Sequence, residues 1–381
     1  MNKNITTLFL SAALTATLFT ACKKDDDKGT DDQPATVNSV PEFYLPAIET
    51  DYGKTAPFAN LILGPSEKVN TPWDLSFNPN KPYELWVLNH GTVNTGASVV
   101  IAQNAGKDGQ TSEFRRDGNA WHFMAMATAI DFGTNGNFGT SQGLQDANHN
   151  GGTFTGPTLW SADLDIFAKV GNPPTSTVNG SHLDMLHGSP FGMGIAHDVD
   201  NVYWVFDGYN GQLVRYDFQT PHPVGADDHS DGRVHRYTEV ELSYFASIPS
   251  HMVLDKATGW LYIAETAKNR ILRVNTKTGS KAEDLQIINE PLAQHWRISS
   301  VTWEVFIDAG LNEPSGIEVK DGRLFVSNHA TGEIHAYNTE TKEKLGSVTT
   351  QAGIMGLQIG PDGKLWFVNS EDDGVYRLDP Q

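Results

Sequence analysis

The chain has 381 residues, with 46 Asp and Glu against 27 Lys and Arg, which gives a formal net charge of −19 at pH 7. An acidic surface repels nucleic-acid phosphates, so we exclude nucleic-acid binding. Metal ions, cationic ligands and the solubility of an exported protein all suit this charge. The single cysteine, Cys22, excludes an internal disulfide. The 36 Gly and 19 Pro favour short strands and tight turns over helices.

The first 21 residues have the layout of a secretory signal. Lys3 precedes an apolar run, Leu8 to Phe19, which is too short to span a bilayer, and small residues come before Cys22. This stretch resembles a bacterial lipoprotein signal. The resemblance implies cleavage before Cys22 and a lipid anchor on that residue, which carries the protein on a membrane. Plain secretion with a free thiol is the alternative.

An acidic segment follows the cysteine. Lys23-Lys24-Asp25-Asp26-Asp27 resembles the export tag that sends lipoproteins of Bacteroidetes-type bacteria to the outer face of the outer membrane. The resemblance implies a lipid-anchored protein exposed at the cell surface. We therefore expect a signal peptide at 1–21, a lipidated acidic linker at 22–41 and a folded domain at 42–381.

Six similar units follow one another in the folded domain. Each predicts a strand, a glycine-containing turn, a strand, a polar turn and a strand, and helical periodicity is nearly absent. Tryptophans in the second strands, Trp86, Trp204 and Trp366, are expected in the core. The units cover residues 72–101, 125–140, 191–216, 249–274, 314–337 and 353–378.

These units resemble NHL repeats, as in Pro314-Ser-Gly-Ile-Glu-Val-Lys-Asp-Gly-Arg-Leu-Phe-Val-Ser-Asn328. The resemblance implies an all-β, six-bladed β-propeller. The segment 58–63 is expected to supply the outer strand of the last blade and close the ring. A seven-bladed ring, with 143–170 as a further unit, is the alternative. Two long insertions, at about 141–189 and 219–247, interrupt the spacing; insertions of this length are usually functional or disordered.

Polar side chains recur where second strands end and where first strands begin, and both places face one mouth of a propeller. Four histidines map there, and neutral imidazole is a common zinc ligand. The alternative is that each histidine satisfies turn groups or a neighbouring acid. The candidate metal ligands are His90, His187, His251 and His329, and the other mouth candidates are Trp73, Asp207, Tyr209, Glu265 and Asn328.

The insertions carry polar clusters of their own. In the first, His182 and His187 with Asp184 form a possible ligand set. In the second, His222-Pro-Val-Gly-Ala-Asp-Asp-His229-Ser-Asp231 is rich in oxygen and imidazole donors. Its three aspartates, Asp227, Asp228 and Asp231, would suit Ca²⁺, although their spacing matches no EF-hand loop. Solvated loops pinned by hydrogen bonds are the alternative for both.

Val205-Phe-Asp-Gly-Tyr209, followed by Leu213-Val-Arg-Tyr, resembles a segment of peptidyl-hydroxyglycine amidating lyases. Those are six-bladed propellers with a three-histidine zinc, and the resemblance implies a catalytic role for Tyr209. His251 lies one place beyond the expected Pro-His ligand, and Pro314-Ser315 stands where the lyases have another such pair. Two of the three zinc ligands are therefore unmatched.

Three functions remain open at this stage. The first is a surface lipoprotein that binds a small molecule, glycan, peptide or partner at the channel mouth. The second is a metal-dependent lyase or hydrolase with Zn or Ca, histidine ligands and Tyr209 as base. The third is a structural or adhesive role. The sequence lacks four known motifs: the Gly-x-Ser-x-Gly nucleophile elbow, the Walker loop, the haem-binding Cys-x-x-Cys-His and the zinc-binding His-Glu-x-x-His helix.

Overall fold

The computed structural model describes residues 40–44, 58–171, 178–286 and 290–380. The signal segment, Cys22 and almost all of the linker lie outside these ranges, so lipid attachment stays a prediction. In the part of the chain that is described, no helix is both long and apolar enough to cross a bilayer. The helical elements are short: η1 (Pro41–Phe43), η3 (Pro65–Glu67), α1 (Ala120–Phe123) and η4 (Thr266–Lys268).

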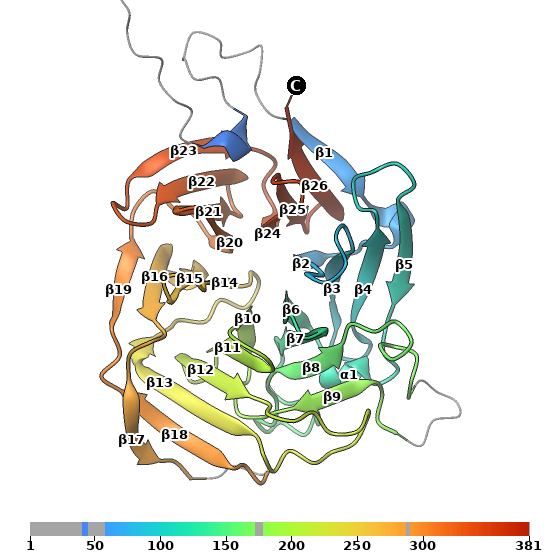
Figure 1. Ribbon diagram of the computed structural model, residues 1–381, viewed down its shortest axis with the longest axis vertical. Helices are drawn as coiled ribbons and strands as arrows, with labels where there is room; N and C mark the ends of the chain where they lie inside the picture. The colour runs from blue at the N-terminus through green and yellow to red at the C-terminus, as the bar shows by residue number, and fades with distance from the viewer. Residues whose placement is uncertain (1–39, 45–57, 172–177, 287–289, 381) are drawn as a thin grey trace, which may run out of the picture. The chain divides into compact units, whose positions relative to one another are not determined.

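Six sheets surround a common centre, and each is one blade of a propeller (Figure 1). Blade 1 contains β2 (Pro72–Phe77), β3 (Leu85–Thr92), β4 (Gly96–Gln103) and β5 (Thr111–Arg115). Blade 2 contains β6 (Ala127–Phe132), β7 (Asn137–Gln142), β8 (Thr158–Ser161) and β9 (His182–Met185). Blade 3 begins with β10 (Gly192–His197), β11 (Val202–Asp207), β12 (Gln212–Asp217) and β13 (Arg233–Glu241).

The second half of the ring repeats this plan. Blade 4 contains β14 (Met252–Asp255), β15 (Trp260–Glu265), β16 (Arg270–Asn275) and β19 (Trp303–Ile307). Blade 5 contains β20 (Pro314–Lys320), β21 (Arg323–Asn328), β22 (Glu333–Asn338) and β23 (Lys344–Thr349). Blade 6 contains β24 (Ile354–Ile359), β25 (Leu365–Asn369), β26 (Gly374–Asp379) and β1 (Phe58–Leu63). The six-bladed prediction is confirmed. The seven-bladed alternative is wrong, because 143–170 supplies the third strand of blade 2.

The ring closes through a strand from the start of the folded domain. β1 pairs antiparallel with β26, with Phe58 opposite Asp379 and Leu61 opposite Tyr376. Leu63, at the end of β1, is 1% exposed and belongs to the core. The predicted closure is therefore confirmed, and it covers the edge that β26 would otherwise leave unpaired.

Close packing between the inner strands of neighbouring blades explains why the repeat has a glycine in its first strand. A Cβ atom on Gly316 would lie 2.1 Å from the Met355 carbonyl oxygen, and one on Gly356 would lie 2.3 Å from Asp74 Oδ1. Only glycine lets neighbouring blades approach this closely. Side chains also link the blades: Gln358 of blade 6 accepts a hydrogen bond from the Phe77 amide of blade 1 at 2.8 Å.

Tryptophans of the second strands fill the spaces between blades. Trp86, Trp204 and Trp366 are each fully buried, as predicted. Trp86 packs against Phe132 and Phe138 of blade 2, with ring centroids 5.5 and 5.0 Å apart. Trp366 of blade 6 likewise packs against Phe77 of blade 1, with ring centroids 5.2 Å apart, so two of these tryptophans join neighbouring blades.

The two long insertions are more than loops. The first carries β8 and β9, the outer half of blade 2, and the second carries β13. Blade 3 is widened further by β17 (Ser280–Asp284) and β18 (Gln294–Ser299), which come from the connection between β16 and β19 of blade 4. β18 pairs in parallel with β13, outside the regular plan of the repeats (Figure 1).

Candidate functional site

Polar residues at the ends of second strands pin the chain that enters each blade. Asn89 Oδ1 accepts from the Asn70 amide at 2.9 Å, and Asn328 Oδ1 accepts from the Asn312 amide at 2.8 Å. Glu265, which is fully buried, accepts from the Ser243 amide at 2.8 Å. Because buried backbone groups need partners, this recurrence has a structural cause. It accounts for Asn328 and Glu265 without a ligand.

Two of the predicted metal ligands hold the inner strand of blade 2. His90 Nδ1 donates to the Ala127 carbonyl at 3.0 Å, and His251 Nε2 donates to the Thr128 carbonyl at 2.9 Å. His90 also stacks on Trp73, with ring centroids 3.6 Å apart. Burial lowers the pKa of His90 to about 4, so its ring is neutral at pH 7.

The central channel beside His251 contains a small cavity with acidic walls. A cavity of about 50 Å³ is lined by His251 and three carboxylates, Asp74, Asp131 and Glu318. Burial raises the pKa of Asp74 to about 6, although the nearby His251 favours the charged form. Asp74 Oδ2 accepts from the Ile130 amide of blade 2 at 2.9 Å, so this carboxylate links blades 1 and 2.

His329 lies apart from the other predicted ligands, on blade 5, where its Nδ1 is 3.2 Å from Glu313 Oε2. Within the described ranges, one group of acidic and histidine side chains brings three potential ligand atoms within 4.8 Å of one another: Asp184, His222 and His229. His90, His187, His251 and His329 are outside it. The site that the repeat alignment predicted for them is not assembled as a close group, and its metal stays a prediction.

Tyr209 opens onto a pocket of about 380 Å³ at the mouth end of blade 3. We call it the Tyr209 pocket. Tyr209 itself is 52% exposed and lies near Phe191, with ring centroids 6.3 Å apart. The pocket has both apolar and polar walls; they include Phe154, His187, Pro190, Tyr209, Asn210, Gln212, Arg236, Thr238, Leu285 and His295.

Arg236, from β13, lines this pocket, and each of its three nitrogens has a partner within the protein. Its Nη1 lies 2.9 Å from Asp207 Oδ2, its Nε donates to His295 Nε2 at 3.1 Å, and its Nη2 donates to the Gly188 carbonyl. Asp207 is fully buried. The guanidinium charge is thus neutralised within the protein, and the pocket offers no free cation to an anionic ligand.

A second cavity, of about 310 Å³, shares Phe154 and His187 with the Tyr209 pocket. We call it the histidine pocket. His187 stacks on Phe154 at 3.5 Å between centroids, and its Nδ1 is 2.5 Å from Glu290 Oε2. Burial, with the charge of His222, lowers the pKa of His182 to about 3. The other walls include His122, Phe123, Asn148, Asn179, Asp227, His229 and Pro291.

Two of the three aspartates proposed for Ca²⁺ accept hydrogen bonds within their own loop, and the third, Asp227, lines the histidine pocket. Asp228 Oδ1 accepts from the amide and hydroxyl of Ser230 at 3.1 and 2.7 Å. Asp231 Oδ2 accepts from the Thr220 amide at 3.1 Å. Neither lies in the group of close ligand atoms described above, and calcium binding stays a prediction.

Sequence reasoning missed Arg236, Glu290 and His295. The repeat pattern predicts the inner strands well, but Arg236 comes from β13, Glu290 from the segment between β17 and β18, and His295 from β18 itself. The apolar residues around Arg236, which are Val234, Tyr237 and Val240, are three residues apart, so the run lacks the alternation that predicts a strand. The parallel pairing of β13 with β18 joins two segments that are far apart in the sequence, so no local sequence pattern predicts it.

Residues 149–381 match the family model described as outer membrane protein assembly factor BamB. The chain belongs to this family. The match covers more than half of the chain, and it confirms neither the NHL repeats nor the amidating lyases that the sequence resembles. No curated protein gives a significant match.

Among solved structures, an auxiliary nutrient binding protein from Bacteroides ovatus aligns with a TM-score of 0.52 and 12% identity over 85% of this chain and 73% of that one. One with the same description from Bacteroides thetaiotaomicron gives 0.53 and 10% identity over 81% and 69%. A streptogramin B lyase gives 0.47 and 14% identity over 86% and 98%. The two nutrient binding proteins share the propeller fold of this chain.

Proposed function

We propose that this chain is a surface-anchored lipoprotein whose propeller binds a small, neutral, polar nutrient molecule in the Tyr209 pocket. The observation that carries the proposal is the pocket itself: about 380 Å³, with an exposed aromatic ring on one wall and amide and hydroxyl groups on the others. Ligand sites in proteins combine this volume with apolar walls and a few fixed polar groups.

The chemistry of the walls favours a sugar-sized ligand without charge. Tyr209 presents a ring face for apolar C–H groups, while Asn210, Gln212 and Thr238 supply hydrogen-bonding ends. Because Asp207 neutralises Arg236, a carboxylate or phosphate on the ligand gains no unpaired cation. Both nutrient binding proteins with the same fold are consistent with this class of function.

The test is a binding screen of the purified full chain against arrays of glycans and short peptides, followed by calorimetry on the best ligand. Tyr209→Ala should weaken binding by at least about tenfold, since an aromatic contact at the centre of a site contributes 1–2 kcal/mol or more. Its Tm should stay unchanged, because the ring is half exposed.

Leu61→Ala is the matched control. Leu61 is 54% exposed and lies on blade 6, away from the lining of the Tyr209 pocket. Equal affinity for the wild type and Tyr209→Ala would contradict the proposed site, and arrays without any ligand would contradict the proposed function.

A further inference from the structure

The two long insertions meet at the border of blades 2 and 3. The amide of Gly225, in the β12–β13 loop, donates to the His182 carbonyl of β9 at 2.9 Å, and the Asn179 amide donates back to the Gly225 carbonyl at 3.2 Å. The start of β9 is itself fixed, because Ser181 donates through its amide and hydroxyl to Asp117 Oδ2 at 2.8 and 2.7 Å. The loop is thus held against a rigid strand.

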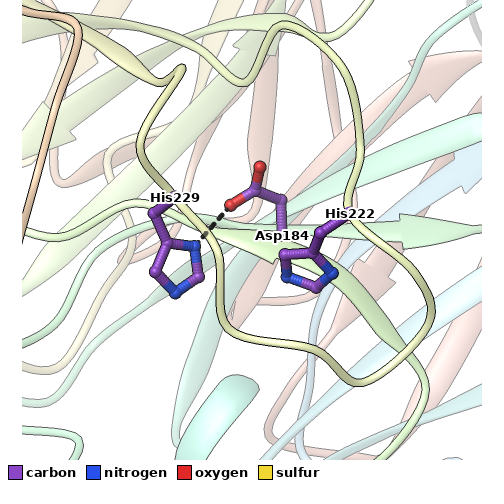
Figure 2. A group of neighbouring side chains, drawn as sticks. All are labelled: Asp184, His222 and His229. Carbon is purple, nitrogen blue, oxygen red and sulfur yellow. Dashed lines mark hydrogen bonds and ion pairs between the residues drawn. The ribbon is translucent and has the colours of Figure 1, made fainter.

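This contact brings three potential ligands together. Asp184 comes from β9, and His222 and His229 come from the β12–β13 loop; one ligand atom from each lies within 4.8 Å of the other two. Figure 2 shows the Asp184 carboxylate between the two imidazole rings. Asp184 is fully buried, and His222 is 8% exposed.

The protonation of the two rings follows from their hydrogen bonds. His222 Nδ1 donates to the Pro223 carbonyl at 2.8 Å, so its proton sits on Nδ1 and the lone pair on Nε2 is free. His229 Nδ1 lies 2.8 Å from Asp184 Oδ1. A histidine whose other nitrogen donates to a carbonyl is oriented as metal-binding histidines usually are.

Two buried atoms of this group have no hydrogen-bond partner in the protein: Asp184 Oδ2 and His222 Nε2. Both are acceptors, so neither can satisfy the other. Leaving a buried polar group unpaired costs about 1–3 kcal/mol, and more for a charged one. A cation between them would satisfy both lone pairs at once.

We propose that Asp184, His222 and His229 bind a divalent transition-metal ion of the zinc class. Two imidazoles and one carboxylate are donors that zinc accepts, whereas Ca²⁺ takes six to eight oxygens. An ion that takes both His229 Nδ1 and Asp184 Oδ1 replaces the proton that those atoms share. The proposal stands independently of ligand binding in the Tyr209 pocket.

The ion would act as a bridge between blades and as part of a cavity wall. It ties the outer strand of blade 2 to the β12–β13 loop of blade 3. His229 also lines the histidine pocket, which shares Phe154 and His187 with the Tyr209 pocket. With three protein ligands, zinc keeps a position for water or for a donor atom of a bound molecule.

The test is Zn²⁺ titration of the full chain after treatment with a chelator, followed by calorimetry, with Co²⁺ as a spectroscopic probe of imidazole ligation. We expect about one equivalent of Zn²⁺, and at least a tenfold loss of affinity in Asp184→Asn and in His222→Gln. His329→Gln is the matched control, because His329 also lies beside a carboxylate, Glu313, but outside the group.

His222→Gln separates metal binding from folding. The readout is the rise in Tm on adding zinc, which His222→Gln should lack whatever the melting temperature of its metal-free form, because His222 Nε2 has no protein partner. Less than half an equivalent of bound zinc, full zinc affinity in both variants, or binding of Ca²⁺ in preference to Zn²⁺ would overturn the proposal.

Discussion

Glu318 should make the propeller lose stability as the pH rises from 5 to 8. It lies on β20 and lines the central channel with Asp74 and Asp131. Burial raises the pKa of Glu318 from 4.5 to about 7, against the Val319 amide, which donates to Oε1 at 2.8 Å and favours the charged form. The folded protein therefore holds this proton more tightly than the unfolded chain.

The sign and size follow from proton linkage. The stabilisation is complete below pH 4.5, the ordinary pKa, and is lost as the pH rises through about 7. Between pH 5 and 8 the loss amounts to about 2.5 kcal/mol. Because the Glu318 side chain keeps some exposure to the channel, water solvates its charge, and we treat this figure as an upper bound.

Glu318→Gln removes this dependence while keeping the size of the side chain. Gln358 occupies the equivalent fifth position of β24 and accepts from the Phe77 amide, which shows that an amide fits there. The assay is urea unfolding at pH 5 and pH 8, with exposed Glu340→Gln as the control. A hydrogen bond lost in Glu318→Gln lowers the free energy of unfolding at both pH values, so it drops out of the difference between them. An equal pH slope for wild type and Glu318→Gln would refute the reasoning.

Three other predictions concern the wall of the Tyr209 pocket, the ring closure and the anchor. Arg236→Lys should lower the free energy of unfolding by about 2–4 kcal/mol in urea, because an ammonium cannot replace the three guanidinium nitrogens that contact Asp207, His295 and the Gly188 carbonyl; an unchanged midpoint would contradict it. Leu63→Ala, in the closing strand, should cost about 2–4 kcal/mol by the same measurement, and a loss below about 0.5 kcal/mol would show that closure adds little. Cys22→Ser should move the protein from the membrane to the soluble fraction and abolish palmitate labelling; membrane retention would exclude the lipid anchor.

Local patterns predicted the regular part of the fold. Alternating apolar residues with turn glycines predicted six units, because each inner strand must bury both faces against neighbouring blades. The same reasoning placed Trp86, Trp204 and Trp366 in the core and assigned 58–63 to ring closure, and all of these are confirmed. The recurring polar position at the ends of second strands was recognised, but its backbone-pinning role was not.

The candidate sites depended on contacts between segments that share no sequence pattern. The parallel pairing of β18 with β13 and the contact of His187 with Glu290, 103 residues away, leave no periodic signal. Asp184 and the histidines of the β12–β13 loop meet only because backbone hydrogen bonds hold two insertions together.

The sequence by itself determined the propeller and its closing strand, because every blade must bury the same faces and therefore repeats the same pattern, and the structure decided between six blades and seven. Only the tertiary structure decided which polar groups converge. It separated His90, His251 and His329 and gave each its own partner, and it brought His222 and His229 to Asp184. The reason is physical. A buried strand needs apolar residues at regular positions, and this leaves a local sequence pattern. Which polar side chains come together depends instead on the paths of loops from neighbouring blades.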